Sequence, residues 1–339
     1  MVRAIRNFSG GRSCNLPLAV FSTIGIGLLA HAVASPDAGT AQASSRRAYA
    51  AYVALERAGA VAVLRGPRWR LASRLRVAGG PHNVAASPDG RFVAVSSPPA
   101  DEVTIIDARR ARVRSRVHVA GSPHDVGFTS NGRFLWVTAE RASRLALVSV
   151  ASGRVVRTVT TSGPPHDLAV DARRNRLWVT IDGSSAVEVR AATNGRLLQR
   201  PRLGAAPHDV GFGPGYRSVW FSNWNSGTLT VVDAASRRVR ARIRVGQEPH
   251  HFAAGAGALW VSDHRGGLLL RVNLSSGRVE HRTRVGSSPH HVATAGSDVL
   301  VAVHGTDRVA LVSPQGRMRT TVRAGRGPHG IAAVKLAPR

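Results

Sequence analysis

The sequence predicts an all-β protein, a seven-bladed β-propeller in which each blade has four strands. Three observations lead to this prediction: a Pro-His pair that recurs at a nearly constant spacing, four short strand-like segments in each repeat, and incomplete repeats at the two ends of the repeated region. Periods near 40 residues with short alternating strands are typical of propeller blades. A repeat architecture also accounts for a chain of 339 residues without a second domain.

The Pro-His pair is the clearest marker of the repeat. Successive histidines of the pair are 39 to 42 residues apart. They are His82, His124, His166, His208, His250, His290 and His329. A fixed period over seven copies indicates one structural unit that is repeated.

Four strands fill each period. In one unit, strand A covers residues 124–128, strand B 134–138, strand C 145–150 and strand D 155–160. The turn between A and B contains a glycine that can take a positive φ. Strand A is expected to be innermost in the ring and strand D outermost.

Large aromatic side chains recur in strand B. Trp136, Trp178, Trp220 and Trp260 share one register, at which we expect Tyr52, Ala94 and Ala302 in the other units. Aromatic rings stacked at one radius are most simply explained as core between blades.

The two ends of the repeated region are expected to complete one blade. Residues 328–334 form a strand A with nothing after it, whereas residues 50–80 contain strands B, C and D with no strand A before them. Pairing of the C-terminal strand A with the N-terminal strands B, C and D would close the ring and leave no open sheet edge. The propeller is therefore predicted to span 48–334, with 335–339 as a tail.

Short motifs in strands A and B resemble a known family. Strand B has Trp-Val-Thr at 136–138 and 178–180 and Trp-Val-Ser at 260–262, and strand A begins with Pro-His-Asp-Val or Pro-His-His-Val. These motifs resemble the YVTN-repeat β-propeller family over residues 48–334. The resemblance implies a secreted or periplasmic propeller, but little about the ligand, because such propellers include binding proteins, scaffolds and enzymes. The Pro-His-Gly-Ile at 328–331 also resembles the repeats of streptogramin lyases.

The N-terminal segment has the pattern of an export signal. Residues 1–15 are basic with no acidic residue, an apolar run covers 16–30, and Ala32-Val33-Ala34 has the small residues that signal peptidase requires. We expect 1–34 to be a signal peptide cleaved after Ala34, with 41–43 as a second possible site. An uncleaved N-terminal anchor is the alternative, although the run is shorter than the roughly 20 residues that span a bilayer. Residues 35–47 are expected to be a flexible spacer, and the protein to be secreted, periplasmic or on the cell surface.

The formal net charge of +28 comes almost wholly from arginine, since Lys335 is the single lysine. Such an excess implies affinity for an anionic polymer, although it also serves as a solubilising surface. Arg112, Arg114 and Arg116 alternate along one outermost strand, which favours a charged, solvated edge over a nucleic-acid tract. We therefore find no strong nucleic-acid signal, and membrane contact is expected only through an uncleaved N-terminal segment. Cys14 is the single cysteine and lies outside the predicted propeller, which excludes disulfides and cysteine-held metals from it.

One face of the propeller is expected to carry the ligand site. In a four-stranded meander the D–A and B–C loops share a face, so the Pro-His pairs lie with the residues that follow strand B. Those residues are Glu56, Ser97, Glu140, Asp182, Trp224, His264 and His304. His251 and His291 are adjacent to the face. Imidazole and carboxylate groups are ligands of Zn²⁺, Mn²⁺ and Fe²⁺ and are also general acid–base groups, so a divalent metal is a possible cofactor.

The candidate ligand-binding residues on this face are His208, His250, His290, Trp224, His264, His304, Glu140 and Asp182. Trp224, His264 and His304 depart from the repeat and indicate a site in their sector, or ordinary loop variation. The repeated histidines themselves also have a structural interpretation: His124 shares strand parity with Val126 and Phe128, so it can point into the seam between blades and hydrogen-bond a neighbouring loop. No residue is assigned as catalytic.

Three functions are consistent with the sequence. The leading hypothesis is an extracytoplasmic module that binds a small ligand or a protein on the histidine-bearing face. The first alternative is a metal-dependent lyase resembling the streptogramin lyases, which requires histidines and acids that converge. The second alternative is a polyanion-binding surface protein. The sequence has no nucleophile-elbow serine, phosphate-binding glycine loop or His-Glu-x-x-His motif.

Overall fold

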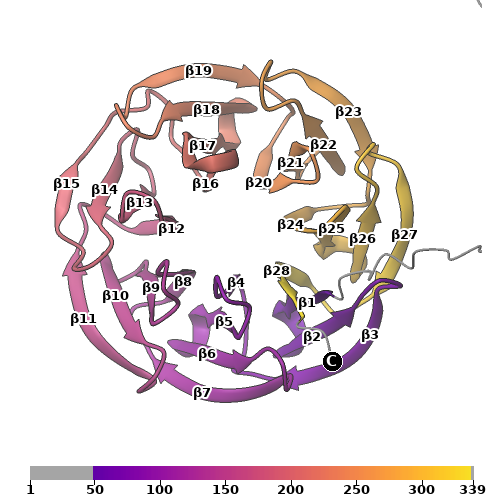
Figure 1. The fold of residues 1–339 in the computed structure, drawn as a ribbon, viewed down its shortest axis with the longest axis horizontal. Coiled ribbons are helices and arrows are strands. Elements are labelled where there is room, and N and C mark those ends of the chain that lie inside the picture. Colours follow the sequence, from indigo (N-terminus) through magenta and orange to yellow (C-terminus); the bar gives the residue numbers. More distant parts are fainter. Residues whose placement is uncertain (1–48, 337–339) are drawn as a thin grey trace, which may run out of the picture. The chain divides into compact units, whose positions relative to one another are not determined.

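Seven four-stranded antiparallel sheets form a closed ring (Figure 1). The computed structural model describes residues 49–336. This arrangement confirms the predicted seven-bladed β-propeller. The expected signal or anchor at 1–34 and the spacer at 35–47 lie outside the described residues. Within the described part of the chain, no helix is long and apolar enough to cross a membrane.

We number the blades so that blade 1 is the one built from both ends of the propeller. Its strands, from the channel outward, are β28 (Pro328–Lys335), β1 (Tyr49–Leu55), β2 (Ala60–Arg65) and β3 (Arg70–Arg76). Blade 2 contains β4 (Val84–Ala86), β5 (Phe92–Ser97), β6 (Glu102–Asp107) and β7 (Arg112–His118). Blade 3 contains β8 (Pro123–Phe128), β9 (Phe134–Ala139), β10 (Arg144–Ser149) and β11 (Arg154–Thr160). Blade 4 contains β12 (Pro165–Asp171), β13 (Arg176–Ile181), β14 (Val187–Ala191) and β15 (Leu197–Gln199).

The remaining three blades follow the same order. Blade 5 contains β16 (Val210–Phe212), β17 (Ser218–Asn223), β18 (Thr228–Asp233) and β19 (Val239–Arg244). Blade 6 contains β20 (Pro249–Gly255), β21 (Ala258–Asp263), β22 (Leu268–Val272) and β23 (Val279–Arg284). Blade 7 contains β24 (Pro289–Ala295), β25 (Asp298–Val303), β26 (Arg308–Val312) and β27 (Met318–Arg323). Short 3₁₀ turns are η1 (Glu56–Ala58), η2 (Pro98–Ala100), η3 (Pro214–Tyr216), η4 (Trp224–Ser226) and η5 (His304–Thr306).

Blade 1 closes the ring as predicted. Strand β28 pairs antiparallel with β1, and Tyr52 lies opposite Ala332. The innermost strand of this blade thus comes from the C-terminal end and its outer three strands from the N-terminal end. The blade at the junction therefore has all four strands, and β1 is not left as an exposed edge.

The hydrophobic core lies between neighbouring blades. Trp136 of blade 3 is fully buried in a cluster with Leu177 and Val179 of blade 4. Its indole N–H donates to the backbone carbonyl of Ala192, 2.8 Å away, and the Tyr52 hydroxyl makes the equivalent bond to Ala108. The aromatic column is therefore inter-blade core, in which the polar atoms of Trp136 and Tyr52 are satisfied, whereas the indole nitrogen of Trp178 has no partner.

The structure corrects two register assignments. In blade 6, Trp260 pairs with Ala253, and the equivalent pair in blade 7 is Leu300 with Ala293, so Leu300 and not Ala302 holds the aromatic register. In blade 2, Pro98 and not Ser97 begins the turn after strand B. The first error arose in a strand that has no aromatic residue to mark the register.

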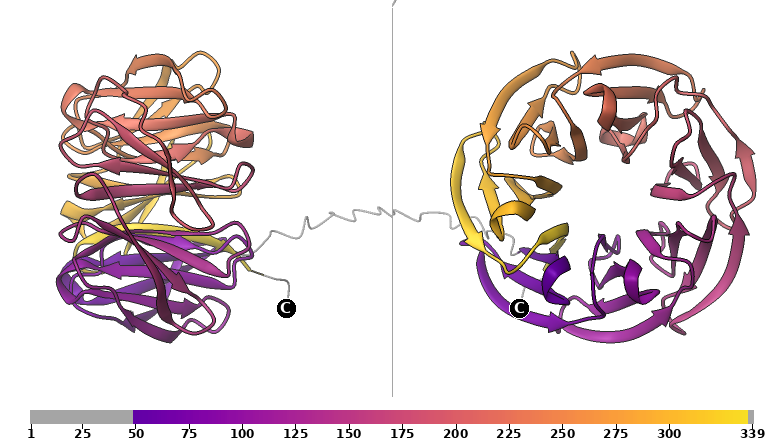
Figure 2. Two further views of the ribbon diagram at one scale, coloured as in Figure 1. Left: turned by 90° about the vertical axis from the view of Figure 1, so that its left-hand side faces the viewer. Right: turned by 180° about the vertical axis from the view of Figure 1, so that it is seen from behind.

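The outermost strands form the wall of the ring, as Figure 2 shows. Most of these strands carry exposed arginines. We call this set the arginine girdle: Arg70, Arg74, Arg76, Arg112, Arg114, Arg116, Arg154, Arg157, Arg240, Arg242, Arg244, Arg282, Arg284, Arg319 and Arg323. Glu280 is the single acidic residue on the same outermost strands. Charge on these strands opposes edge pairing between molecules.

Candidate ligand and metal site at the histidine ring

The seven Pro-His pairs bring their imidazoles together around the channel. Each pair lies at the start of an innermost strand, so the ring of blades places seven histidines at one level. Every imidazole contacts the next, with centroid distances between neighbours from 3.7 to 4.6 Å. We call this set the histidine ring: His82, His124, His166, His208, His250, His290 and His329. Sequence spacing alone therefore produces a continuous imidazole surface.

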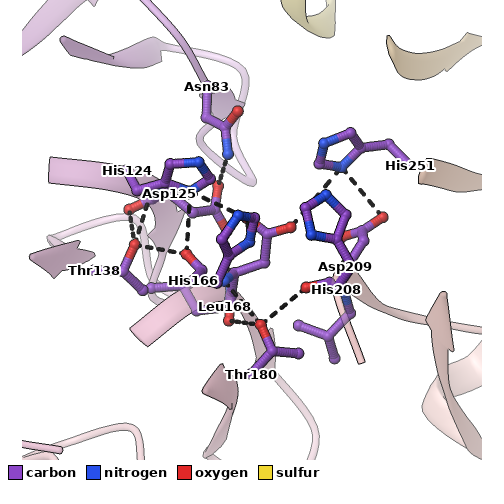
Figure 3. A network of polar contacts seen from close by, with 12 residues as sticks. Asn83, His124, Asp125, Thr138, His166, Leu168, Thr180, His208, Asp209 and His251 are labelled. Carbon is purple, nitrogen blue, oxygen red and sulfur yellow. Dashed lines mark hydrogen bonds and ion pairs between the residues drawn. The ribbon is translucent and has the colours of Figure 1, made fainter. Parts of the chain in front are cut away.

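In blades 2 to 5, a buried hydroxyl group of strand B ties the innermost strand of its own blade to that of the next blade. Thr180 accepts a hydrogen bond from the backbone N–H of Asp167 in its own blade and donates one to the carbonyl of His208 in the next, both at 2.9 Å. Thr138 links blades 3 and 4 in the same way, as Figure 3 shows. Ser96 and Ser222 make the equivalent bridges in blades 2 and 5. These hydroxyls position the histidine ring.

A second level of side chains follows the histidine ring by one residue in each blade. Its members are Asn83, Asp125, Asp167, Asp209, His251, His291 and Gly330. Three adjacent blades thus contribute carboxyl groups, the next two contribute imidazoles, and blade 1 contributes no side chain. The site is therefore divided into two parts. The acidic sector contains Asp125, Asp167 and Asp209 with His124 and His166, and the imidazole sector contains His208, His250, His251, His290, His291 and His329.

The acidic sector is centred on Asp167, which is buried. Its carboxylate lies 3.4 Å from Nδ1 of His166 and 3.5 Å from Nδ1 of His124. Asn83 donates to the carboxyl group of Asp125 at 3.0 Å, and Figure 3 shows these groups converging. Asp209 lies 3.4 Å from Nδ1 of His251.

Neighbouring charges separate the protonation behaviour of these groups. Burial raises the pKa of a carboxyl group, but the His166 and His124 side chains hold the pKa of Asp167 well below its usual range. Burial and the Asp167 charge instead raise the pKa of Asp125 to about 7. Burial by itself lowers the pKa of an imidazole, yet the carboxylate of Asp167 raises the pKa of His166 to about 9. At neutral pH the sector holds a charged His166–Asp167 pair.

The imidazole sector is neutral over a wide pH range. The rings of His251 and His291 stack with their centroids 3.4 Å apart. Burial, reinforced by the neighbouring histidines, lowers the pKa of His290 to about 2 and that of His208 to about 3. Burial also lowers the pKa of His291 to about 4. Neutral imidazole is the form that coordinates metal ions.

Many buried polar atoms of this site have no hydrogen-bond partner within the protein. Among the described residues they include Nδ1 of four histidines in the imidazole sector and Nε2 of His208. The four are His250, His290, His291 and His329. Leaving a buried polar group unpaired costs about 1–3 kcal/mol. Such a concentration of unpaired polar atoms marks a place that is suited to binding a ligand, an ion or water.

Several three-residue groups in the site have the chemistry of metal ligands. In each, one potential ligand atom per residue lies within 4.8 Å of the others. The groups are His208, His250 and His251; His290, His291 and His329; His124, His166 and Asp167; and Asp167, Asp209 and His251.

Trp224, His264 and His304 lie above the imidazole sector. Trp224 and His304 begin the turns η4 and η5, directly after strand B of their blades. The Trp224 ring meets those of His208 and His250 edge to face at 4.8 and 4.5 Å between centroids. His264 is 4.9 Å from His290 by the same measure.

His304 is fixed by an acidic partner. Its Nε2 atom lies 2.9 Å from the Glu56 carboxylate, and its ring centroid is 5.2 Å from that of His290.

The structure thus brings six of the eight predicted site residues into one cluster: His208, His250, His290, Trp224, His264 and His304. Glu140 stands apart from this cluster, on the His166 side, where its charge contributes to the raised pKa of that imidazole. Asp182 is exposed, and its carboxylate accepts a hydrogen bond from the adjacent Gly183 N–H at 2.9 Å. His124 is buried, and its Nδ1 lies 3.3 Å from the backbone carbonyl of His166 in the neighbouring blade.

The sequence analysis did not single out the bridging hydroxyls or the carboxyl groups of Asp125, Asp167 and Asp209. The signal was available, because Thr or Ser follows each strand B tryptophan by two residues and Asp follows three of the repeat histidines. Recognising it required knowing that the Thr or Ser of strand B and the Asp after the repeat histidine lie close together in the folded blade.

Fold and site together define a seven-bladed β-propeller with an imidazole- and carboxylate-lined channel. The chain belongs to the YNCE-like beta-propeller family, which matches residues 14–216, more than half of its length. No curated protein matches the chain in sequence.

Solved propellers of several functions share the fold. The periplasmic gluconolactonase PpgL of Pseudomonas aeruginosa is 20% identical, with a TM-score of 0.69 over 85% of this chain and 99% of that one. Kuenenia stuttgartiensis hydrazine synthase is 17% identical, with a TM-score of 0.66 over 75% of this chain and 89% of that chain. Citrobacter koseri AztD is 13% identical, with a TM-score of 0.65 over 86% of this chain and 99% of that one. At these identities the likeness establishes the fold and leaves function to the site.

Proposed function

We propose that this protein is an exported, YVTN-type binding protein whose ligand is held at the imidazole sector of the histidine ring. The observation that carries the proposal is the set of buried ring nitrogens there without partners, on His250, His290, His291 and His329. A ligand that accepts from or coordinates these atoms would offset the cost of their burial.

The fold suits a rigid binding site. The histidines belong to the innermost segments of the blades, and among those of the imidazole sector the backbone of His250 is also tied to the preceding blade by Ser222. Because these imidazoles are already ordered in the folded protein, little side-chain entropy is lost when a ligand binds. Trp224 and His264 add an aromatic and polar rim around the same sector.

Native mass spectrometry tests this proposal without knowledge of the ligand. The chain is purified under mild conditions from the exported fraction of its own host, together with a His250→Ala/His290→Ala double variant. We expect a bound mass that is retained by wild type and lost from the double variant. Arg154→Ala, on the distant arginine girdle, is the matched control and should retain it. A wild-type protein with the bare chain mass throughout would contradict the proposal.

The same preparation tests export. The basic start, the apolar run and Ala32-Val33-Ala34 predict an N-terminus near Ser35 or Ser44, or an intact anchor in the membrane fraction. Recovery of the intact chain as a soluble cytoplasmic protein would contradict export.

The acidic sector favours a second candidate, a metal-dependent lyase. Burial and the Asp167 charge raise the pKa of Asp125 to about 7, whereas the His166 and His124 side chains lower that of Asp167, and such a divergence is how active sites separate an acid from a base. The test is turnover of cyclic esters by wild type, by Asp167→Asn and by the Asp182→Asn control. If the protein is this enzyme, the Asp167→Asn variant should fold normally but lose turnover, whereas wild type and the Asp182→Asn control should keep it.

A further inference from the structure

We propose that His290, His291 and His329 form a site for one divalent transition-metal ion of the class that prefers imidazole, such as zinc, copper or nickel. The inference rests on the proposed function, since it names the class of ligand that the imidazole sector binds.

The three imidazoles converge from two adjacent blades. His290 and His291 begin the inner strand β24 of blade 7, and His329 begins β28 of blade 1. One ring nitrogen from each lies within 4.8 Å of the other two. A tetrahedral zinc ion with bonds near 2.0–2.1 Å needs its ligand nitrogens roughly 3.3 Å apart. Small rotations of the side chains therefore suffice to close the site.

This group differs from the other candidate groups because none of its imidazoles is paired with a carboxylate. Nδ1 of all three residues is buried and without a hydrogen-bond partner. In the other groups at least one imidazole faces a carboxylate: His124 and His166 face Asp167, and His251 faces Asp209. A metal in those groups would have to displace an existing ion pair.

The repeat is broken where the proposed site lies. The position after the repeat histidine is Asp in blades 3, 4 and 5, but it is His251 in blade 6 and His291 in blade 7. The bridging hydroxyl of strand B is replaced by Ala302 in the same blade. A purely structural histidine ring would require neither change, so the departures favour a local function.

Blade 1 contributes no further ligand at the level of His291. The equivalent position there is Gly330, where an added Cβ would lie 2.3 Å from the backbone oxygen of His82, so that no side chain fits. Three imidazoles with an open fourth position resemble the ligand count of exchangeable and catalytic zinc sites more than that of closed structural ones. Hard cations such as Mg²⁺ and Ca²⁺, which prefer oxygen ligands, are not expected to bind.

The test is metal titration of the full chain prepared without a polyhistidine tag and stripped with a chelator. Co²⁺ serves as the visible-absorbing probe and Zn²⁺ as its competitor. We expect one tightly bound Co²⁺ per chain, displaced by Zn²⁺ and unaffected by excess Mg²⁺ or Ca²⁺. Zinc-edge X-ray absorption should report three imidazole ligands.

Variants assign the ligands. Loss of a ligand should weaken binding by more than the roughly 10- to 100-fold typical of losing a ligand's supporting partner. We expect this for His291→Ala and His329→Ala, whereas the matched control His124→Ala should stay within a few-fold of wild type. Melting temperatures measured with chelator present identify any variant that fails to fold. If His291→Ala fails to fold, the His291→Asn variant, which keeps a polar side chain, is used in its place.

Two outcomes would overturn the assignment of the ligands. One is Co²⁺ binding that His291→Ala and His291→Asn leave unchanged. The other is an equal loss in His124→Ala, which would place the metal in the acidic sector. If the wild-type protein binds no metal, the proposed metal site is wrong. The proposed binding function would still stand in that case if native mass spectrometry showed another ligand that is lost from the His250→Ala/His290→Ala variant.

Discussion

Replacement of Thr180 by valine should measure how strongly the bridging hydroxyls hold the ring together. The Thr180 side chain is fully buried, and valine fills nearly the same volume without the hydroxyl. The substitution leaves the Asp167 N–H and the His208 carbonyl without the bonds that Thr180 makes to them. At about 1–3 kcal/mol for each unpaired buried group, the expected loss of stability is roughly 2–6 kcal/mol.

That loss converts to a change in melting temperature. A folded region of this size has an unfolding entropy near 0.6 kcal/mol/K, so each kcal/mol lowers Tm by roughly 1.7 °C, and Thr180→Val should lower it by about 3–10 °C. Thr180→Ser is the matched control, because Ser96 and Ser222 make the same bridges in other blades. Calorimetry in the presence of a chelator gives the comparison. Equal Tm values for the valine and serine variants would refute the bridging role.

Three further outcomes are expected. Deletion of residues 326–339 removes β28 from blade 1 and should lower Tm sharply, and an unchanged thermal melt would argue against ring closure. The His264→Ala/His304→Ala double variant should lose the bound mass in native mass spectrometry with little change in Tm, because both side chains are only partly buried and lie in loops. Acidification from pH 7 to pH 5 should lower Tm, because burial lowers the pKa of His208 to about 3 and that of His291 to about 4. In the unfolded chain these histidines bind protons near the ordinary pKa of about 6.5, whereas in the folded chain they stay neutral. Below that pKa each such group lowers the free energy of unfolding by about 1.4 kcal/mol per pH unit. A Tm that holds or rises over this range would show that these imidazoles protonate in the folded state.

The fold could be predicted because its determinants are local and repeated. The repeated spacing of the histidines from His82 to His329 sets the number of blades. A strand A at 328–334 that is not followed by strands B, C and D identifies the closing blade. Register was predictable where Trp136 or Trp178 marks it and failed at Leu300, where an aliphatic residue holds the same place.

The site was predictable only in part. Loop order placed Trp224, His264 and His304 on the face of the repeat histidines, and they do meet there. The division into acidic and imidazole sectors was not predicted, because it depends on which residue of one blade faces which residue of the next. Asp167 illustrates this, since its partner His124 belongs to the preceding blade.

The pairing of β28 with β1 also has a kinetic consequence. Ala332 meets Tyr52, so the last contact that the ring needs joins residues from opposite ends of the propeller sequence. Contacts with a long separation along the chain form slowly, because a large loop must close before they contribute. We expect the other blades to assemble first and His329 to reach its place last, so that a chain interrupted before β28 has no complete His290–His291–His329 site. Binding competence would thus report that synthesis and folding of the whole propeller are finished.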